Sequence, residues 1–143
     1  MQHKKITGLI PHRPPFVFID KVISAQEGKV VTSRFIKKDE EYFKGHFPGH
    51  PLVPGVLIIE SMAQTAGIAA AGNQDDIFFL SRVLDIKFKA PVFPEATMQI
   101  TAEVIMKYAN FAKAAVKAEV NNKIVAEGEL VLARQDSRQS LFD

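Results

Sequence analysis

Two polar residues of proton-transferring type, His46 and Glu60, lie fourteen positions apart around an apolar turn and the start of a predicted helix. Only one helical neighbour of Glu60 is polar; the neighbours are Val56, Leu57, Ala63 and Gln64. An ionised carboxylate there costs several kcal/mol unless it is paired, so the setting favours a protonated carboxyl that could act as a general acid. The alternative is a structural glutamate that hydrogen-bonds Gln64 or a backbone group across an interface.

His46 begins a stiff loop over residues 46–55, which contains three prolines and two glycines. A lone loop histidine is more often structural or solvated than catalytic, but the prolines restrict where His46 points. His50 follows four residues later. The prolines and glycine around it exclude the helix on which an HxxxH pair could bind a metal, and no third ligand is spaced nearby. We therefore expect no metal site.

The predicted helix, from Gly55 to about Ala71, begins directly after Pro54. The first N–H groups of a helix lack partners and lie at its positive end, so those of Gly55 and Val56 could stabilise a carbonyl that becomes enolate-like. Glycine also permits a ligand to approach the backbone closely. Ordinary helix capping explains a proline and a glycine at the start of the helix equally well.

The elements around this centre predict one α+β domain over residues 1–143, with a tail from about 135 that we expect to be disordered. Strands are predicted over 16–25, 29–36 and 77–89. From Met98 to Met106 apolar residues alternate with polar ones, and 112–120 and 124–132 repeat the pattern around a tight turn at 121–122. This pattern predicts a curled antiparallel sheet wrapped around one long buried helix.

Composition narrows the function class. The net charge of +2 is too small for a nucleic-acid-binding surface, and the absence of cysteine excludes thiolate chemistry and fits a reducing compartment. No apolar run reaches the roughly 20 residues of a membrane span. Nucleotide-binding glycine motifs are absent. We expect a cytoplasmic protein without a cofactor.

Residues 45–64, GHFPGHPLVPGVLIIESMAQ, resemble the FabZ-type β-hydroxyacyl-acyl carrier protein dehydratases of bacterial fatty acid synthesis. Two further segments are similar to motifs of that family and occur in the same order: PHRPPFVFID (11–20) and KFKAPVFP (87–94). The resemblance covers roughly residues 9–134. A sister branch that also isomerises the double bond carries aspartate at the acidic position, so Glu60 favours the FabZ type.

The resemblance implies a hot-dog fold and a homodimer, commonly assembled into a trimer of dimers, with His46 of one chain facing Glu60 of the other. Neutral His46 would take a proton from C2 of a 3-hydroxyacyl thioester held on acyl carrier protein. Glu60 would protonate the departing 3-hydroxyl, and Gln64 would orient its carboxyl. The N–H of Gly55 or Val56 would polarise the thioester carbonyl.

Two further expectations concern substrate contacts. An apolar tunnel for the acyl chain would include Phe79, Phe88, Phe93 and Met98, although core packing is the simpler interpretation of each. A basic rim for an acidic carrier protein would comprise Lys37, Lys38, Lys44, Lys87 and Lys89, although surface lysines usually signify only solvation.

Two competing functions remain open at this level. A thioesterase on the same fold would use an acidic residue to activate water, which the His46–Glu60 spacing argues against. A non-catalytic acyl-binding partner subunit would be expected to have lost one of the two residues, and this chain retains both.

Overall fold

The strands form one antiparallel sheet in the order β1-β2-β4-β5-β6-β3. The computed structural model describes residues 5–71 and 75–135, so the predicted tail from about 135 lies outside the described residues. The strands are β1 (Lys21–Gln26), β2 (Lys29–Phe35), β3 (Ile77–Phe88), β4 (Thr97–Tyr108), β5 (Phe111–Val120) and β6 (Lys123–Gln135). The helices are α1 (Gly55–Ala70) and two 3-10 turns, η1 (Ile6–Gly8) and η2 (Glu41–Lys44).

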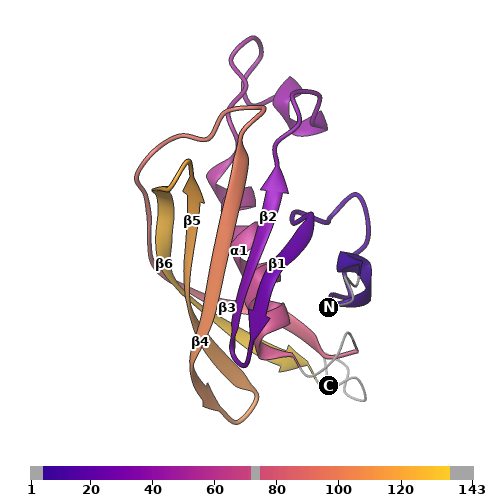
Figure 1. Ribbon diagram of the computed structural model, residues 1–143, viewed down its shortest axis with the longest axis vertical. Coiled ribbons are helices and arrows are strands. Elements are labelled where there is room, and N and C mark those ends of the chain that lie inside the picture. The colour runs from indigo at the N-terminus through magenta and orange to yellow at the C-terminus, as the bar shows by residue number, and fades with distance from the viewer. Residues whose placement is uncertain (1–4, 72–74, 136–143) are drawn as a thin grey trace.

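Helix α1 lies behind the sheet in Figure 1, and the strands curve around it. Its buried residues, Met62 and Ala66 among them, share one core with sheet residues such as Ile100 and Leu130. This arrangement of a curled antiparallel sheet around one long helix confirms the predicted α+β, hot-dog architecture. None of the described helices is long and apolar enough to cross a membrane.

Short turns hold the sheet in register. Asn121 and Asn122 both have positive φ, 52° and 64°, and join β5 to β6. Two such residues form the hairpin turn whose twist matches that of the strands, and asparagine tolerates it better than most side chains. The predicted tight turn is therefore confirmed.

The predicted strand over 16–25 is only partly correct, because β1 begins at Lys21. The backbone just before β1 is bonded to side chains of α1. The N–H of Phe18 donates to the amide oxygen of Gln64 at 2.9 Å, and its carbonyl accepts from the Ser61 hydroxyl at 2.7 Å. These groups are thus unavailable to a neighbouring strand, whatever the β propensity of the segment.

Met106 also differs from expectation. The alternation places it on the core side with Met98, but its side chain is 58% exposed. The pairing of β4 with β5 shifts between Val104 and Met106, so β4 carries one extra residue there. Such a bulge turns the following side chains to the other face.

Candidate active site

His46 lies in the loop between η2 and α1, with its ring nitrogen Nδ1 2.8 Å from the Leu52 carbonyl oxygen. Because a carbonyl oxygen only accepts, Nδ1 carries the proton in this contact, and Nε2 of the neutral ring keeps a free electron pair. The N–H of Leu52 donates back to the His46 carbonyl at 3.1 Å, and the His46 ring stacks on Phe47 with centroids 4.1 Å apart. Nε2 is therefore the nitrogen that can act as a base.

Glu60 lies on α1, and its oxygen Oε2 accepts a hydrogen bond from Nε2 of Gln64 at 3.1 Å. Two backbone groups fix the orientation of the Gln64 amide: its oxygen accepts from the Phe18 N–H at 2.9 Å, and its nitrogen donates to the Phe16 carbonyl at 3.0 Å. A flipped amide would face both groups with the wrong atom. The predicted contact of Gln64 with Glu60 is therefore present, with Oε2 as the acceptor.

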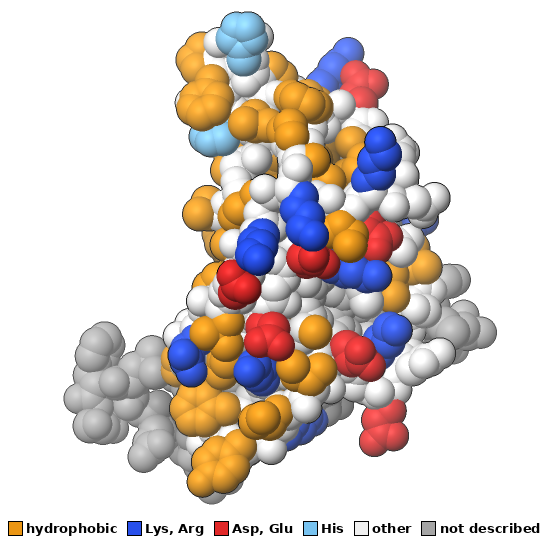
Figure 2. All heavy atoms as spheres, turned by 90° about the vertical axis from the view of Figure 1, so that its left-hand side faces the viewer, with side chains coloured by type: hydrophobic (Ala, Val, Ile, Leu, Met, Phe, Trp, Pro, Cys, Tyr) orange, Lys and Arg blue, Asp and Glu red, His pale blue; other side chains and the backbone are white. Residues whose placement is uncertain are grey.

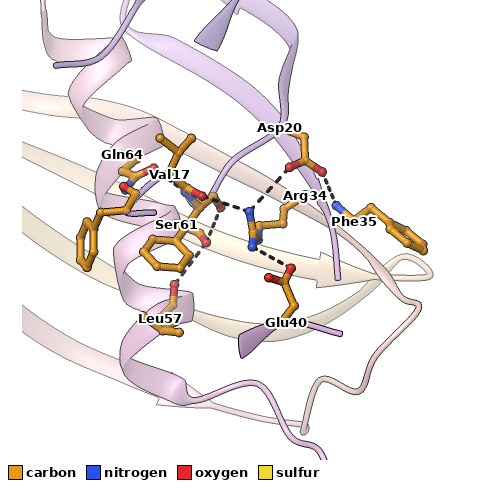
Figure 3. Close-up of polar contacts among 10 residues, drawn as sticks. Val17, Asp20, Arg34, Phe35, Glu40, Leu57, Ser61 and Gln64 are labelled. Carbon is orange, nitrogen blue, oxygen red and sulfur yellow. Dashed lines mark hydrogen bonds and ion pairs between the residues drawn. The ribbon is translucent and has the colours of Figure 1, made fainter. Parts of the chain in front are cut away.

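The segment before β1 is held from two sides, as Figure 3 shows. Ser61 and Gln64 of α1 bond to the backbone of Phe18 on one side. On the other side, Arg34 of β2 donates to the Val17 carbonyl at 3.1 Å. These hydrogen bonds fix the position of the segment relative to α1, beside Glu60.

Arg34 is a buried cation that is stabilised by carboxylates. Its guanidinium lies 2.9 Å from Glu40 and 3.6 Å from Asp20, and 5.3 Å from the centre of the Phe18 ring. A buried charge requires such partners. Nearby, burial and then the charge of Glu40 raise the pKa of the Tyr42 hydroxyl above its ordinary value, so this phenol stays neutral at physiological pH.

His12 is a neighbour of Glu60 to which the sequence analysis assigns no role. Its Nε2 lies 3.5 Å from Glu60 Oε2, and the two side chains are 27% and 21% exposed. The other nitrogen, Nδ1, is buried and has no hydrogen-bond partner among the described residues. His12 is 48 positions from Glu60 and 34 from His46 along the chain, and spacing alone gives no reason to connect them. The sequence feature that could have pointed to His12 is that it is a titratable residue with prolines on both sides, Pro11 before it and Pro14 after it.

Glu60, Gln64 and His12 line one pocket of about 200 Å³. The rest of its wall is mainly apolar and comes from the N-terminal segment, α1, β3 and β6, with Phe16, Phe79 and Leu132 among the lining residues. A pocket with few polar groups on an apolar wall is typical of a site for a mostly apolar ligand.

The start of α1 presents free N–H groups. Among the described residues the N–H groups of Gly55 and Val56 have no acceptor, while those of Leu57 and Ile58 both donate to the Pro54 carbonyl. The ring of Phe88 covers Gly55 so closely that a Cβ there would lie 3.0 Å from the ring carbon Cζ. A side chain at this position would require the exposed Phe88 ring to move by a few tenths of an ångström, and the site remains a predicted oxyanion site.

His46 and Glu60 do not meet within one chain. Both belong to the described residues, and no hydrogen bond or ion pair joins them. His46 sits in the loop that extends beyond the end of the sheet in Figure 1, whereas Glu60 lies on the second turn of α1. No three His, Asp or Glu side chains in the described part of the chain are grouped so that they could hold a metal ion.

The four residues predicted for the acyl tunnel do not share one pocket in this chain. Phe79 lines the pocket beside Glu60, and Phe88 lies over Gly55. Phe93 is exposed, and Met98 is buried in the core. The tunnel stays a prediction.

Most lysines of the predicted basic rim lie next to acidic side chains. Four of its five lysines lie within 4 Å of an acidic side chain: Lys38 of Glu95, Lys44 of Glu41, Lys87 of Asp85 and Lys89 of Glu127. The hydrogen bond from Lys89 lowers the pKa of Glu127 below its ordinary value. Figure 2 shows basic and acidic side chains interleaved across the middle of one face, without a large region of one sign.

Sequence comparison places residues 10–129 in the FabA-like domain family. The chain is 41% identical to the 3-hydroxyacyl-[acyl-carrier-protein] dehydratase FabZ of Ruminiclostridium cellulolyticum, over 93% of this chain and 96% of that protein. It is 42% identical to the enzyme of the same name from Listeria welshimeri, over 93% and 95%. That from Roseiflexus castenholzii is 35% identical over 91% and 94%.

Solved structures share the fold at low sequence identity. The dehydratase heterocomplex ApeI:P from Xenorhabdus doucetiae superposes with a TM-score of 0.83 at 16% identity, covering 96% of this chain and 95% of that one. A hypothetical thioesterase with coenzyme A from Streptococcus pneumoniae gives 0.64 at 11% identity, covering 83% and 88%. These likenesses show the fold alone.

Fold and site together define a class, the hot-dog proteins with an acidic side chain on the central helix. The sequence relatives narrow the class, since the three compared above are all named as FabZ-type dehydratases. The chain belongs to the FabA-like family, and within it to the FabZ type of dehydratase.

Proposed function

We propose that the protein removes water from 3-hydroxyacyl thioesters of acyl carrier protein to give trans-2-enoyl thioesters. The observation that supports this assignment most directly is that one residue is arranged to accept a proton and the other to donate one. His46 has a free electron pair on Nε2, and Glu60 has one oxygen fixed as an acceptor while the other, Oε1, has no hydrogen-bond partner among the described residues. The FabZ-type relatives, about 41% identical over most of the chain, carry this function in their names.

The reaction uses one proton acceptor and one proton donor. Nε2 of His46 takes the C2 proton, and the C2–H electrons form the new C2–C3 double bond. The C3–O bond breaks with its electron pair on oxygen, and the Glu60 carboxyl supplies the proton that turns this hydroxyl into water. The N–H groups of Gly55 and Val56 stabilise the negative charge that develops on the thioester oxygen. His46 then holds a positive charge and Glu60 a negative one, and proton exchange with water resets both.

A second copy of the chain completes the site in this proposal, since His46 and Glu60 do not meet within one chain. Strand β3 offers a surface for this copy. It is an edge strand, and its apolar side chains Ile77, Phe79, Leu80 and Val83 are between 38% and 46% exposed. An apolar edge strand of this kind is a site where another chain can pair. A trimer of such dimers and a cytoplasmic location stay predictions.

Hydration of crotonyl-CoA, the reverse reaction on a small thioester, tests the function directly. We expect the wild type to hydrate it, and His46→Ala and Glu60→Gln to lose activity by about 10²- to 10⁴-fold, the usual contribution of a positioned acid or base. His50→Ala is the matched control, because His50 is an exposed histidine of the same loop and should keep wild-type activity. Near wild-type rates in either folded site variant would show that the assigned pair is wrong.

A further inference from the structure

The neighbour of Glu60 that the proposed reaction leaves unused is His12. It enters the pocket from the segment between η1 and β1, and its Nε2 lies 3.5 Å from Oε2 of Glu60. That oxygen is also the acceptor of the Gln64 hydrogen bond at 3.1 Å. The nitrogen atoms of His12 and Gln64 therefore both lie next to Oε2 of Glu60, and neither contacts Oε1.

The surroundings of His12 determine which of its nitrogens carries the proton. Nδ1 is buried and has no hydrogen-bond partner in the described part of the chain. A buried N–H without an acceptor is rarer and less favourable than a buried acceptor without a donor. The proton of the neutral ring therefore belongs on Nε2, the nitrogen that lies 3.5 Å from Glu60 Oε2.

We infer that His12 is a positioning residue for Glu60. Gln64 donates to Oε2 and His12 faces the same oxygen from 3.5 Å, so that the transferable proton resides on Oε1. This inference rests on the proposed dehydration, in which Glu60 gives its proton to the departing hydroxyl. As that proton leaves Oε1, negative charge spreads over the carboxylate, and the Gln64 N–H bonded to Oε2 and the nearby Nε2–H of His12 stabilise it.

Hydrogen bonds to the backbone after His12 restrict its position, which a positioning residue requires. The amide of Gln64 fixes Phe16 and Phe18, and Arg34 fixes Val17, so the backbone that follows His12 is held on both sides (Figure 3). The His12 ring also stacks parallel to that of Phe16, with centroids 6.4 Å apart. A group that orients an acid must itself be held, and these contacts hold it.

Steady-state hydration of crotonyl-CoA by two variants tests the inference. His12→Leu removes the donor, and His12→Gln keeps an N–H near the position of Nε2. We expect kcat of His12→Leu to fall about tenfold or more with KM within about twofold, and His12→Gln to recover most of kcat. Loss of kcat in both variants alike, a change in KM alone, or wild-type kcat in His12→Leu would overturn the inference.

A second measurement serves if His12→Leu does not fold. In ¹⁵N-histidine-labelled wild type, with His12→Gln used to assign the signal, the ring should be protonated at Nε2, and this signal should shift in Glu60→Gln. A ring protonated at Nδ1, or a signal unmoved by Glu60→Gln, contradicts the inference. Failure of the proposed function looks different, because the wild type would then be inactive or Glu60→Gln would be as active as the wild type.

Discussion

Gln64 is the residue on which the geometry of Glu60 most depends. Its amide bonds to the backbone of Phe16 and Phe18 and to the carboxyl of Glu60 at once. The link to Glu60 could be predicted, because residues four apart on a helix face each other. The links to residues 16 and 18 could not, since no spacing rule connects positions nearly fifty residues apart.

Gln64→Glu isolates the donor function of this amide. The new carboxylate has nearly the same shape and still accepts from the Phe18 N–H, but it donates to neither Glu60 nor Phe16 and adds a like charge beside Glu60. We expect kcat for crotonyl-CoA hydration to fall by about ten- to a hundredfold and the free energy of unfolding by about 1–3 kcal/mol. Steady-state kinetics and urea unfolding measure the two effects, and an unchanged kcat would remove Gln64 from the site.

At the scale of elements, α1 is fastened to the sheet by buried polar contacts as well as by its apolar side chains. Thr65 of α1 and Thr32 of β2 are fully buried, and their hydroxyl oxygens lie 2.8 Å apart. Because Thr65 donates to the Ser61 carbonyl at 2.9 Å, its hydroxyl accepts from Thr32. The sequence predicts α1 as a buried helix from its apolar residues. The contact between Thr32 and Thr65 could not be predicted, because the distribution of apolar residues along the chain says nothing about which neutral polar side chains meet.

A double-mutant cycle on the two threonines tests this contact. Thr65→Val keeps the shape but leaves the buried Thr32 hydroxyl without an acceptor, so we expect a loss of about 1–3 kcal/mol in the free energy of unfolding. Thr32→Val added to Thr65→Val removes the stranded hydroxyl and should recover part of that loss. Urea unfolding of the four proteins gives the coupling, and additive losses would mean that the hydroxyls do not interact.

In the strands, the alternation of apolar and polar residues predicts the buried side chains correctly in β5 but not throughout β4. Ala112, Ala114, Val116 and Ala118 of β5 are all buried, as the alternation predicts. The failure at Met106 follows from one extra residue in β4, which the alternation of residue types does not reveal. A second irregularity lies in β3 opposite Gly128, where a Cβ would come within 2.8 Å of the Asp85 carbonyl oxygen.

Gly128→Ala tests the close approach of β3 and β6. The contact is with backbone, which cannot move aside as a flexible side chain can, so we expect a loss of about 1–3 kcal/mol in the free energy of unfolding. Gly8→Ala is the control, because nothing lies within 4 Å of its added Cβ. Equal stability of the two variants would contradict the packing described for β3.

At the scale of the whole molecule, the proposed active site requires a second chain. Val83 on the edge strand β3 is 46% exposed and apolar, and Ile23 on the opposite edge strand β1 is 49% exposed. If two copies pair along β3, Val83→Lys should shift the protein from dimer to monomer and remove activity with the dimer, because burying a charge on an apolar surface is unfavourable. Ile23→Lys should do neither. Analytical ultracentrifugation distinguishes the outcomes, and a Val83→Lys protein that stays dimeric and active would place the interface elsewhere.

Complementation between inactive variants tests whether the dehydratase site is completed by two chains. His46→Ala and Glu60→Gln are co-expressed with different tags, and the mixed dimer is assayed for crotonyl-CoA hydration. Each mixed dimer regains one intact site, so an unfractionated equal mixture should reach about a quarter of wild-type activity. His46→Ala paired with the His46→Ala/Glu60→Gln double variant regains none and is the control. Activity in the first mixture alone is the predicted result, and a first mixture as inactive as its parents would contradict a site shared between chains.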